Sequence, residues 1–389
     1  MKRLFTIMVG AALVAGCADR GPVDVPSQRA VGPGLDAAVV AGSAGIKVMT
    51  YNVYYGTNAE PLLAVTDPNQ IPFVAVGIWA LAQQTNFPER AGALAAEIAK
   101  QRPHLVGLQE AALYRIQSPG DAASGGTVAA TQVVYDFLGL LVDSLAAHGE
   151  QYVVAAADAT TDIEIPVYTG VGAIPFDDVR LTDRDAVLVR GDVAWGEAQS
   201  DRWVAHIPVL GSGVYEGWAS VVATIEGRDY RFVSTHLEAQ LAKDVNEAQA
   251  DELLALLEDE TRPTILVGDF NSDAYGLLPE KATASYGKIL DAGFVDTWSW
   301  SGRHNAGLTC CQADDLVNSF GTYDTRVDFI FTRNMTQVIP AGTLVLDRTL
   351  VGDRPGDRTA SGLWPSDHAG VVTTFLIPPA GPRSAPVAE

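Results

Sequence analysis

The stretch Thr264-Ile265-Leu266-Val267-Gly268-Asp269-Phe270-Asn271-Ser272-Asp273 decides how the rest of the chain is interpreted. It begins with an apolar run, rich in Ile and Val, of the kind found in strands that are buried on both faces. Gly268 interrupts this run, and Asp269 and Asn271 follow where the strand should end. Strand ends of this kind bind ligands in open α/β sheets, but Asp, Asn and Gly are also the commonest turn residues. The stretch alone favours a turn and a ligand site equally.

Polar side chains stand at the ends of several other predicted strands. Each has an ordinary structural explanation when it is taken alone, since a single His after a strand is usually a hydrogen-bonded structural residue and Asp328 could pair with Arg326. Their repeated position at strand ends nevertheless favours one shared site. Besides Asp269 and Asn271, these residues are Asn52, Glu110, His236, Asp328, Asp367 and His368.

The succession of strands and helices predicts the fold class. Residues 45–53 alternate apolar and polar side chains, which is typical of a strand, and residues 88–100 carry Ala, Leu and Ile at helical spacing after a Pro. Further strands are expected at 104–110, 151–157, 185–190, 219–226, 229–235, 263–268, 326–332, 342–346 and 369–377, and helices at 131–147 and 244–259. Strands outnumber helices and many are adjacent hairpin partners, so the pattern predicts a mixed-sheet sandwich with helices outside.

Residues 57–86 look like an insertion into this pattern. They include an apolar piece, residues 71–81, that could form a lid or a helix beside the site. Packing against the body of the domain is the interpretation that we favour.

The ordered motifs resemble those of the endonuclease/exonuclease/phosphatase superfamily, which includes deoxyribonuclease I, exonuclease III, neutral sphingomyelinases and inositol polyphosphate 5-phosphatases. The matching motifs are T-Y-N-V, L-Q-E, S-T-H-L-E, G-D-F-N-S, R-V-D-F-I and S-D-H, and they extend from Thr50 to His368. This resemblance implies a four-layered α/β/β/α sandwich with two mixed, mainly antiparallel sheets. It places the active site at the strand ends along one edge, in a domain of residues 45–378.

The resemblance also implies a metal-dependent hydrolase of phosphate esters. Its principal metal ligand would be Glu110, with Asn52 and Asp367 close to the same ion or to a second one. Mg²⁺ suits such oxygen ligands, with Mn²⁺ or Ca²⁺ as alternatives. A divalent cation lowers the barrier because it neutralises and positions the phosphate oxygens.

The remaining residues receive catalytic roles by the same resemblance. Asp269 would orient or deprotonate the attacking water, and Asn271 would donate to a non-bridging phosphate oxygen. His368, held by Asp328, would stabilise the pentacovalent phosphate or protonate the leaving oxygen, since a neighbouring carboxylate raises the pKa of an imidazole. His236 would contact the phosphate, together with Asn52. S-T-H-L-E, with His236, is typical of the deoxyribonuclease and sphingomyelinase branches, and not of exonuclease III.

Arg184 is a further candidate phosphate ligand. It precedes a predicted strand that the family places near the site, but a surface ion pair with Asp183 or Asp185 explains it equally well.

The charge of the chain limits its partners. The 389 residues carry a net charge of −21 and only 6 His, so protonation of the imidazoles cannot reverse the sign. A general polyanion-binding protein would normally present a basic face. A phosphate-cleaving enzyme is still compatible with this charge, because a bound divalent cation supplies positive charge locally.

The N-terminus predicts export and lipid anchoring. Lys2 and Arg3 precede an apolar run that is too short to span a bilayer comfortably, which is typical of a signal peptide. Val14-Ala15-Gly16-Cys17 resembles a bacterial lipobox, so we expect residues 1–16 to be removed and Cys17 to be lipidated. Residues 17–44 would be a flexible tether and residues 379–389 a disordered tail. The protein is expected on the periplasmic or outer-membrane side of a bacterial membrane, or on the cell surface.

The other two of the 3 cysteines, Cys310 and Cys311, are adjacent. Two cysteines cannot build a disulfide framework. A disulfide between them and two free thiols are both compatible with the sequence.

Several substrates remain open at this stage. A nuclease or nucleotide phosphodiesterase outside the cytoplasm is favoured, although no run of Lys or Arg supports it. A sphingomyelinase- or phospholipase C-like enzyme is the first alternative, and an inositol-phosphate or other phosphomonoesterase the second. A lipoprotein that keeps the fold but only binds a partner is the non-enzymatic alternative. No protein partner is predicted, and we expect a monomer.

Overall fold

The computed structural model describes residues 44–209, 212–239, 242–276, 278, 282–298, 306–335 and 344–377. The predictions for the signal peptide, Cys17, the tether and the C-terminal tail fall outside these ranges, apart from residue 44. Within the described ranges, no helix combines the length and the apolar character that are needed to cross a membrane.

Two six-stranded sheets form the centre of the fold. The first has the strand order β17(Leu344–Val351)-β18(Gly370–Ile377)-β1(Ala44–Asn52)-β2(Leu105–Gln109)-β8(Ala186–Arg190)-β5(Tyr152–Ala157). The second has the order β15(Val295–Asp296)-β16(Asp328–Arg333)-β14(Thr264–Asp269)-β13(Arg228–His236)-β12(Gly217–Ile225)-β9(Ala194–Arg202). Within each sheet one pair of strands is parallel, β1 with β2 and β13 with β14, and the other pairs are antiparallel.

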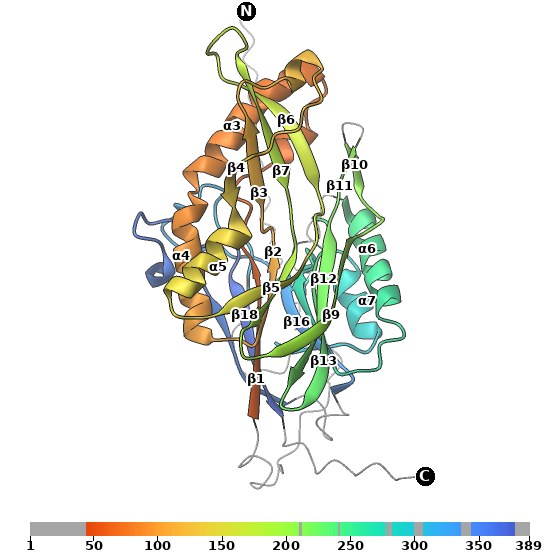
Figure 1. Cartoon of the computed structure of the whole chain (residues 1–389). Helices are drawn as coiled ribbons and strands as arrows, with labels where there is room; N and C mark the ends of the chain where they lie inside the picture. Colours follow the sequence, from red (N-terminus) through yellow and green to blue (C-terminus); the bar gives the residue numbers. More distant parts are fainter. Residues whose placement is uncertain are drawn as a thin grey trace, which may run out of the picture. The chain divides into compact units, whose positions relative to one another are not determined.

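Alternating side chains of these strands build the layers. In β1, Ile46 and Val48 enter the core between the two sheets, whereas Met49 and Tyr51 enter the core beneath the helices α4(Phe87–Gln101) and α5(Phe137–Ala147). The second sheet is covered on its outer face by α6(Lys243–Leu256) and α7(Ser285–Asp291). Figure 1 shows the two pairs of helices on opposite sides of the sheets. The predicted four-layered α/β/β/α sandwich with two mainly antiparallel sheets is therefore confirmed.

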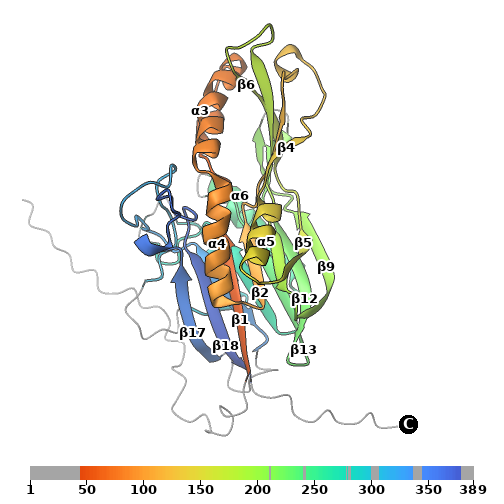
Figure 2. The ribbon, with the colours of Figure 1, turned by 60° about the vertical axis from the view of Figure 1, so that its left-hand side comes forward.

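A further group of elements projects beyond the sandwich (Figure 2). It contains a four-stranded sheet of order β4(Gln132–Asp136)-β3(Leu113–Gln117)-β7(Phe176–Thr182)-β6(Asp162–Tyr168) and the hairpin of β10(Ile207–Val209) and β11(Ser212–Val214). The predicted insertion forms α2(Glu60–Leu63), a 3₁₀ turn η1(Pro68–Gln70) and α3(Ile71–Gln84). Other 3₁₀ turns are η2(Ala122–Ser124) and η5(Pro355–Asp357).

One local expectation is met and another needs correction. Residues 71–81 form a helix, which the sequence allowed, and Pro72 is tolerated because it stands in the first turn, where a missing N–H costs nothing. The helix expected at 131–147 begins only at Phe137, because residues 132–136 pair with β3 as a strand.

Gly268 is required by the register of β14. Its φ is +150°, and a Cβ added there would lie 1.9 Å from the carbonyl oxygen of Thr235 on the neighbouring strand. The glycine thus lets β14 lie close against β13 at the point where both strands approach their ends.

Candidate active site

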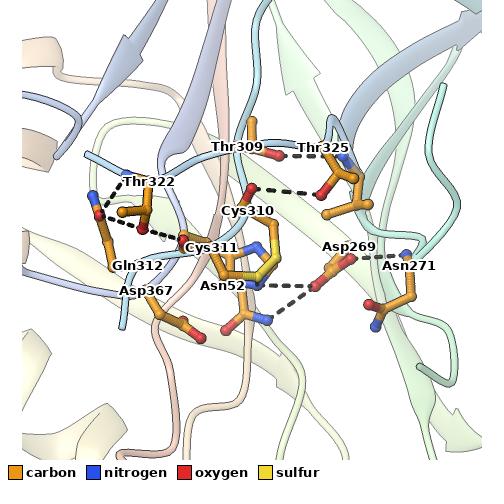
Figure 3. Close-up of a disulfide and its surroundings, with 12 residues drawn as sticks. Asn52, Asp269, Asn271, Thr309, Cys310, Cys311, Gln312, Thr322, Thr325 and Asp367 are labelled. Carbon is orange, nitrogen blue, oxygen red and sulfur yellow. Dashed lines mark hydrogen bonds and ion pairs between the residues drawn. A yellow bond between two sulfur atoms is a disulfide. The ribbon is translucent and has the colours of Figure 1, made fainter. Parts of the chain in front are cut away.

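The strand register brings three predicted residues into one row. His236 pairs with Asp269 between β13 and β14, and Asp269 pairs with Asp328 between β14 and β16. On the other sheet, Asn52 ends β1 and Glu110 follows β2 directly. These strand ends meet, because the Asn52 amide donates both to Glu110 Oε1 (2.8 Å) and to Asp269 Oδ2 (3.1 Å). Figure 3 shows Asn52 directed at Asp269.

Two imidazoles converge on the Asp269 carboxylate. His236 Nε2 and His368 Nε2 each lie 3.7 Å from the same oxygen, Asp269 Oδ2. The other oxygen, Oδ1, accepts a hydrogen bond from the Asn271 backbone N–H (2.8 Å). Asp269 is only 1% exposed. One buried carboxylate therefore faces two imidazoles, one from the end of β13 and one from the segment before β18.

Each imidazole is backed by its own carboxylate. Glu216 Oε2 lies 3.0 Å from His236 Nδ1, and Asp328 Oδ2 lies 2.9 Å from His368 Nδ1. Burial lowers the pKa of both histidines, but the charges and hydrogen bonds of these and neighbouring carboxylates outweigh it and raise the pKa well above the ordinary 6.5. The raised pKa favours the imidazolium form of both rings, in which Nε2 can donate a hydrogen bond.

Glu110 has a backbone conformation that is rare for its residue type. Its φ is +59°, in the left-handed region. Its carboxylate accepts from Asn52 and from the Tyr55 N–H (2.9 Å). Burial raises its pKa to about 7, and burial also raises the pKa of the nearby Asp367 to about 7. Glu110 is buried and Asp367 is partly buried. Two neighbouring carboxylates whose ionised forms are destabilised fit a divalent cation, because hard cations prefer carboxylate oxygens.

Buried hydrogen bonds hold the ends of these strands in position. The Arg90 guanidinium, fully buried in α4, donates to the carbonyls of Val53 (2.8 Å), Tyr54 (2.9 Å) and Pro365 (2.9 Å). The Ser366 hydroxyl donates to the Asn52 carbonyl (2.7 Å). The end of β1 is thereby tied to the segment that carries Asp367 and His368.

Asn271 lies inside the site, whereas the Arg184 guanidinium contacts the segment next to it. Asn271, with φ +47°, directs its Nδ2 to the Leu237 carbonyl (2.9 Å) and lies 3.1 Å from His236 Nε2, inside the site. The Arg184 guanidinium donates to the Ala111 carbonyl (2.8 Å) and pairs with Asp136 (2.6 Å) instead of Asp183 or Asp185. It supports the segment after Glu110, and its role as a phosphate ligand stays a prediction.

The alternative pairing of Asp328 with Arg326 does not form, and Asp328 holds His368 as the resemblance implied. Arg326 pairs with Asp296 (2.6 Å), which leaves the Asp328 carboxylate to His368.

Sequence reasoning missed the residues around His236. Asp183, Glu216 and His236 each place one potential ligand atom within 4.8 Å of the others, as do Asp269, Asp328 and His368. Burial raises the pKa of Asp183 to about 7. The signal for Glu216 was weak, because it stands alone in V-Y-E-G-W before a strand.

Cys310 and Cys311 form a disulfide beside the same site. Cys311 Sγ lies 3.9 Å from His368 Nε2. Figure 3 shows the disulfide next to Asn52 and Asp269. Of the two states that the sequence left open, the structure contains the disulfide.

Most of these groups line a single cavity of about 620 Å³. Glu110, His236, Asp269, Asn271, Asp367 and His368 contribute to its wall, and Asn52 and Asp328 contact these residues without lining the cavity themselves.

Comparison with known proteins identifies the family. The model of the endonuclease/exonuclease/phosphatase family matches residues 49–368, a range that includes all the strand-end residues. A solved endonuclease/exonuclease/phosphatase from Beutenbergia cavernae is 17% identical over 87% of this chain and 73% of its own, with a TM-score of 0.51. A family protein from Bacteroides thetaiotaomicron is 16% identical over 86% of this chain and 98% of its own, also with a TM-score of 0.51. These two likenesses show the fold alone. No curated protein matches the chain.

Proposed function

The chain belongs to the endonuclease/exonuclease/phosphatase family, and we propose that it is a divalent-metal-dependent hydrolase of phosphate esters that acts outside the cytoplasm. The observation that carries the proposal is the convergence of two carboxylate-backed imidazoles on Asp269, next to Glu110. Such a set offers positive hydrogen-bond donors, a base and an oxygen ligand around one point. Transfer of a phosphoryl group to water needs these elements.

Each of these residues would have its own role in the reaction. The Asp269 carboxylate accepts a hydrogen bond from the attacking water and orients it toward phosphorus. His236 donates through Nε2 to a non-bridging phosphate oxygen, while Glu216 holds its ring. His368 donates to the departing oxygen and delivers its proton, and Asp328 holds that ring through Nδ1. The carboxylates behind both imidazoles raise their pKa, which favours the protonated form that these roles require.

Glu110, Asp367 and Asn52 are the residues that would hold the metal ion, and we propose Mg²⁺, with Mn²⁺ or Ca²⁺ as alternatives. A bound divalent cation neutralises the phosphate oxygens and polarises the phosphorus. The Asn52 side chain also links Glu110 to Asp269, so the metal ligand and the water-orienting carboxylate keep a fixed separation.

The type of ester belongs to the same proposal. The sequence favoured a phosphodiesterase or nuclease, with a sphingomyelinase- or phospholipase C-like activity as the alternative. The net charge of −21 opposes long nucleic acids. Anchoring through Cys17 would keep the enzyme at the membrane surface, and labelling with radioactive palmitate, lost in Cys17→Ser, tests this location.

Hydrolysis of bis-p-nitrophenyl phosphate tests the reaction. The purified protein is assayed with Mg²⁺, Mn²⁺ or EDTA, beside Asp269→Asn and the matched control Asp251→Asn, which changes an exposed carboxylate on α6. We expect metal-dependent turnover that falls roughly 10²- to 10⁴-fold in Asp269→Asn and stays near wild type in Asp251→Asn. Turnover that survives EDTA or Asp269→Asn would overturn the proposal. Absence of turnover on this ester, plasmid DNA, sphingomyelin and inositol polyphosphates would instead favour the binding protein.

A further inference from the structure

The catalytic cavity continues along the four-stranded sheet outside the sandwich. Thr161, Ile163, Ile165 and Val167 line it, and this spacing of two places all four side chains on one face of β6 and the residue before it. At the catalytic end, the Asp183 N–H donates to the Thr161 carbonyl (2.7 Å). The six residue steps from Thr161 to Val167 extend for about 20 Å, at roughly 3.3 Å per step. The cavity wall thus extends from the cluster of Asp183, Glu216 and His236 into an apolar region.

One face of α3 forms the facing wall. Ala75, Ile78, Trp79 and Ala82 line the cavity, and their spacing of i, i+3, i+4 and i+7 defines a single helical stripe. Helix and sheet meet where the rings of Phe73 and Tyr168 approach to 4.9 Å between centroids. Figure 2 shows α3 and β6 extending side by side beyond the sandwich.

Ala75, Ala82 and Val167 belong to the hydrophobic core beneath the helices, and the same residues also line the cavity. Protein interiors contain few voids larger than a water molecule, and a volume of about 620 Å³ is typical of ligand pockets. Trp79, Ile163, Ile165 and Leu181 remain partly accessible although they face inward. The arrangement is that of a binding cavity.

The charge of the lining selects against polyanions. Among the described residues, no Lys or Arg lines the cavity, whereas Glu60, Asp183, Glu238 and Asp314 do. Nucleic acids and inositol polyphosphates carry several phosphates, and each would need a cationic contact beyond the catalytic centre. A substrate with one phosphate and an uncharged, apolar remainder matches the lining better.

We propose that this cavity binds the hydrocarbon chain of an amphiphilic phosphate ester, so that lipid-type phosphoesters are the substrate class of the catalytic site. This inference rests on the proposed phosphate-ester hydrolysis. The ester phosphate lies among Glu110, His236 and His368, and its chain lies between α3 and β6. Water adds to phosphorus, the ester P–O bond breaks, and the proton from water ends on the departing alcohol oxygen.

A series of p-nitrophenyl alkyl phosphates tests the proposal. The alkyl group grows from methyl to decyl, each ester is kept below its micelle-forming concentration, and kcat/KM is measured with Mg²⁺. Transfer of one methylene from water to an apolar site corresponds to about fourfold. We expect a rise of at least 10²-fold from methyl to octyl, followed by a plateau when the cavity is full. A flat series, or faster cleavage of oligonucleotides than of any alkyl ester, would overturn the inference.

A matched pair of variants locates the effect. Ile165→Trp narrows the cavity and should bring the ratio of kcat/KM for octyl and methyl esters close to one. Val133→Trp adds the same side chain to the same sheet at a position that is 55% exposed and outside the cavity, so the ratio should stay as in wild type. Equal ratios in both variants would show that the chain binds elsewhere.

Binding without turnover separates this inference from the proposed function. Calorimetric titration with decyl phosphate and methyl phosphate, in EDTA, measures the chain alone. Decyl phosphate should bind at least 10²-fold more tightly, and equal affinities would refute the cavity assignment whatever the enzyme hydrolyses. Tight decyl binding together with no hydrolysis of any ester would keep the cavity and overturn the catalytic proposal.

Discussion

Replacing Glu110 by Gln should stabilise the metal-free protein at pH 8 and destabilise it at pH 5. Burial raises the pKa of Glu110 from 4.5 to about 7. A carboxyl group whose pKa is higher in the folded state destabilises the fold above that pKa, where it is ionised in both states. The destabilisation is absent below the unfolded pKa. It therefore develops as pH rises from about 4.5 to about 7.

The magnitude follows from the size of the shift. The rise of about 2.5 units corresponds to roughly 3.4 kcal/mol at high pH, of which nearly all is present at pH 8 and less than about 1 kcal/mol at pH 5. Gln cannot ionise, so it removes this penalty. In wild type, the Glu110 carboxylate accepts hydrogen bonds from the Asn52 amide and from the Tyr55 N–H. The Gln side chain would place its NH₂ group against one of these two donors, which costs about 1–3 kcal/mol of stability at either pH. The difference in the free energy of unfolding between Glu110→Gln and wild type should therefore change by about 2.5 kcal/mol from pH 5 to pH 8.

Urea unfolding in EDTA, followed by the fluorescence of the 7 Trp residues, measures these free energies. Glu258→Gln, at an exposed position, serves as the control and should show no pH-dependent difference. Mg²⁺ at roughly 100 times its Kd should then stabilise the wild type by about 2.7 kcal/mol and leave Glu110→Gln unchanged. If the gap between Glu110→Gln and wild type in EDTA is the same at pH 5 and pH 8, the reasoning is refuted.

Three further predictions concern the two imidazoles and the disulfide. Asp328→Asn removes the nearest charge that raises the His368 pKa, so the alkaline limb of kcat/KM against pH should move to lower pH; an unmoved limb would contradict the acid role. Glu216→Gln should lower kcat roughly 10²-fold while circular dichroism shows the same fold, and full activity would exclude His236 from catalysis. Reduction of the Cys310–Cys311 disulfide should make the activity sensitive to inhibition by micromolar Zn²⁺, because the freed thiolates and His368 form a soft ligand set. Equal inhibition by Zn²⁺ before and after reduction would argue against this ligand set.

The sequence predicted the sandwich and the strand-end residues for a local reason. A strand that ends in Asn52, Glu110 or Asp269 carries its own periodicity and its own terminal side chain, so both are visible within a few residues. The order of these motifs along the chain then indicated that the strand ends belong together. Asp328 contacts His368 as the resemblance implied, and the alternative partner Arg326 pairs with Asp296.

The parts that escaped prediction depend on distant pairings. Glu216 is a partner of His236 only because β12 and β13 lie side by side, and nothing next to Glu216 in the sequence shows this. Residues 162–168 alternate Ile and Val with polar residues, but Pro166 weakens the strand signal. The segment becomes a strand because it is the edge of its sheet, pairing only with β7. The cavity is lined by α3, by β6 and by the catalytic strand ends, and no sequence motif connects these three parts of the chain.

The burial of so many carboxylates around this site is itself an argument for a ligand cation. Asp183, Glu216 and Asp269 are all at least nine-tenths buried, Asp367 is partly buried beside them, and the imidazoles of His236 and His368, whose pKa values are raised, face these carboxylates most directly. Each uncompensated buried charge lowers the stability of the fold, and apolar residues of similar size would avoid that cost. A structural role does not explain the arrangement, whereas a site that must attract a divalent cation does. If these carboxylates serve to bind a divalent cation, bound Mg²⁺ should neutralise their excess negative charge. The free energy of unfolding of the metal-bound protein should then depend on pH much less than that of the metal-free protein.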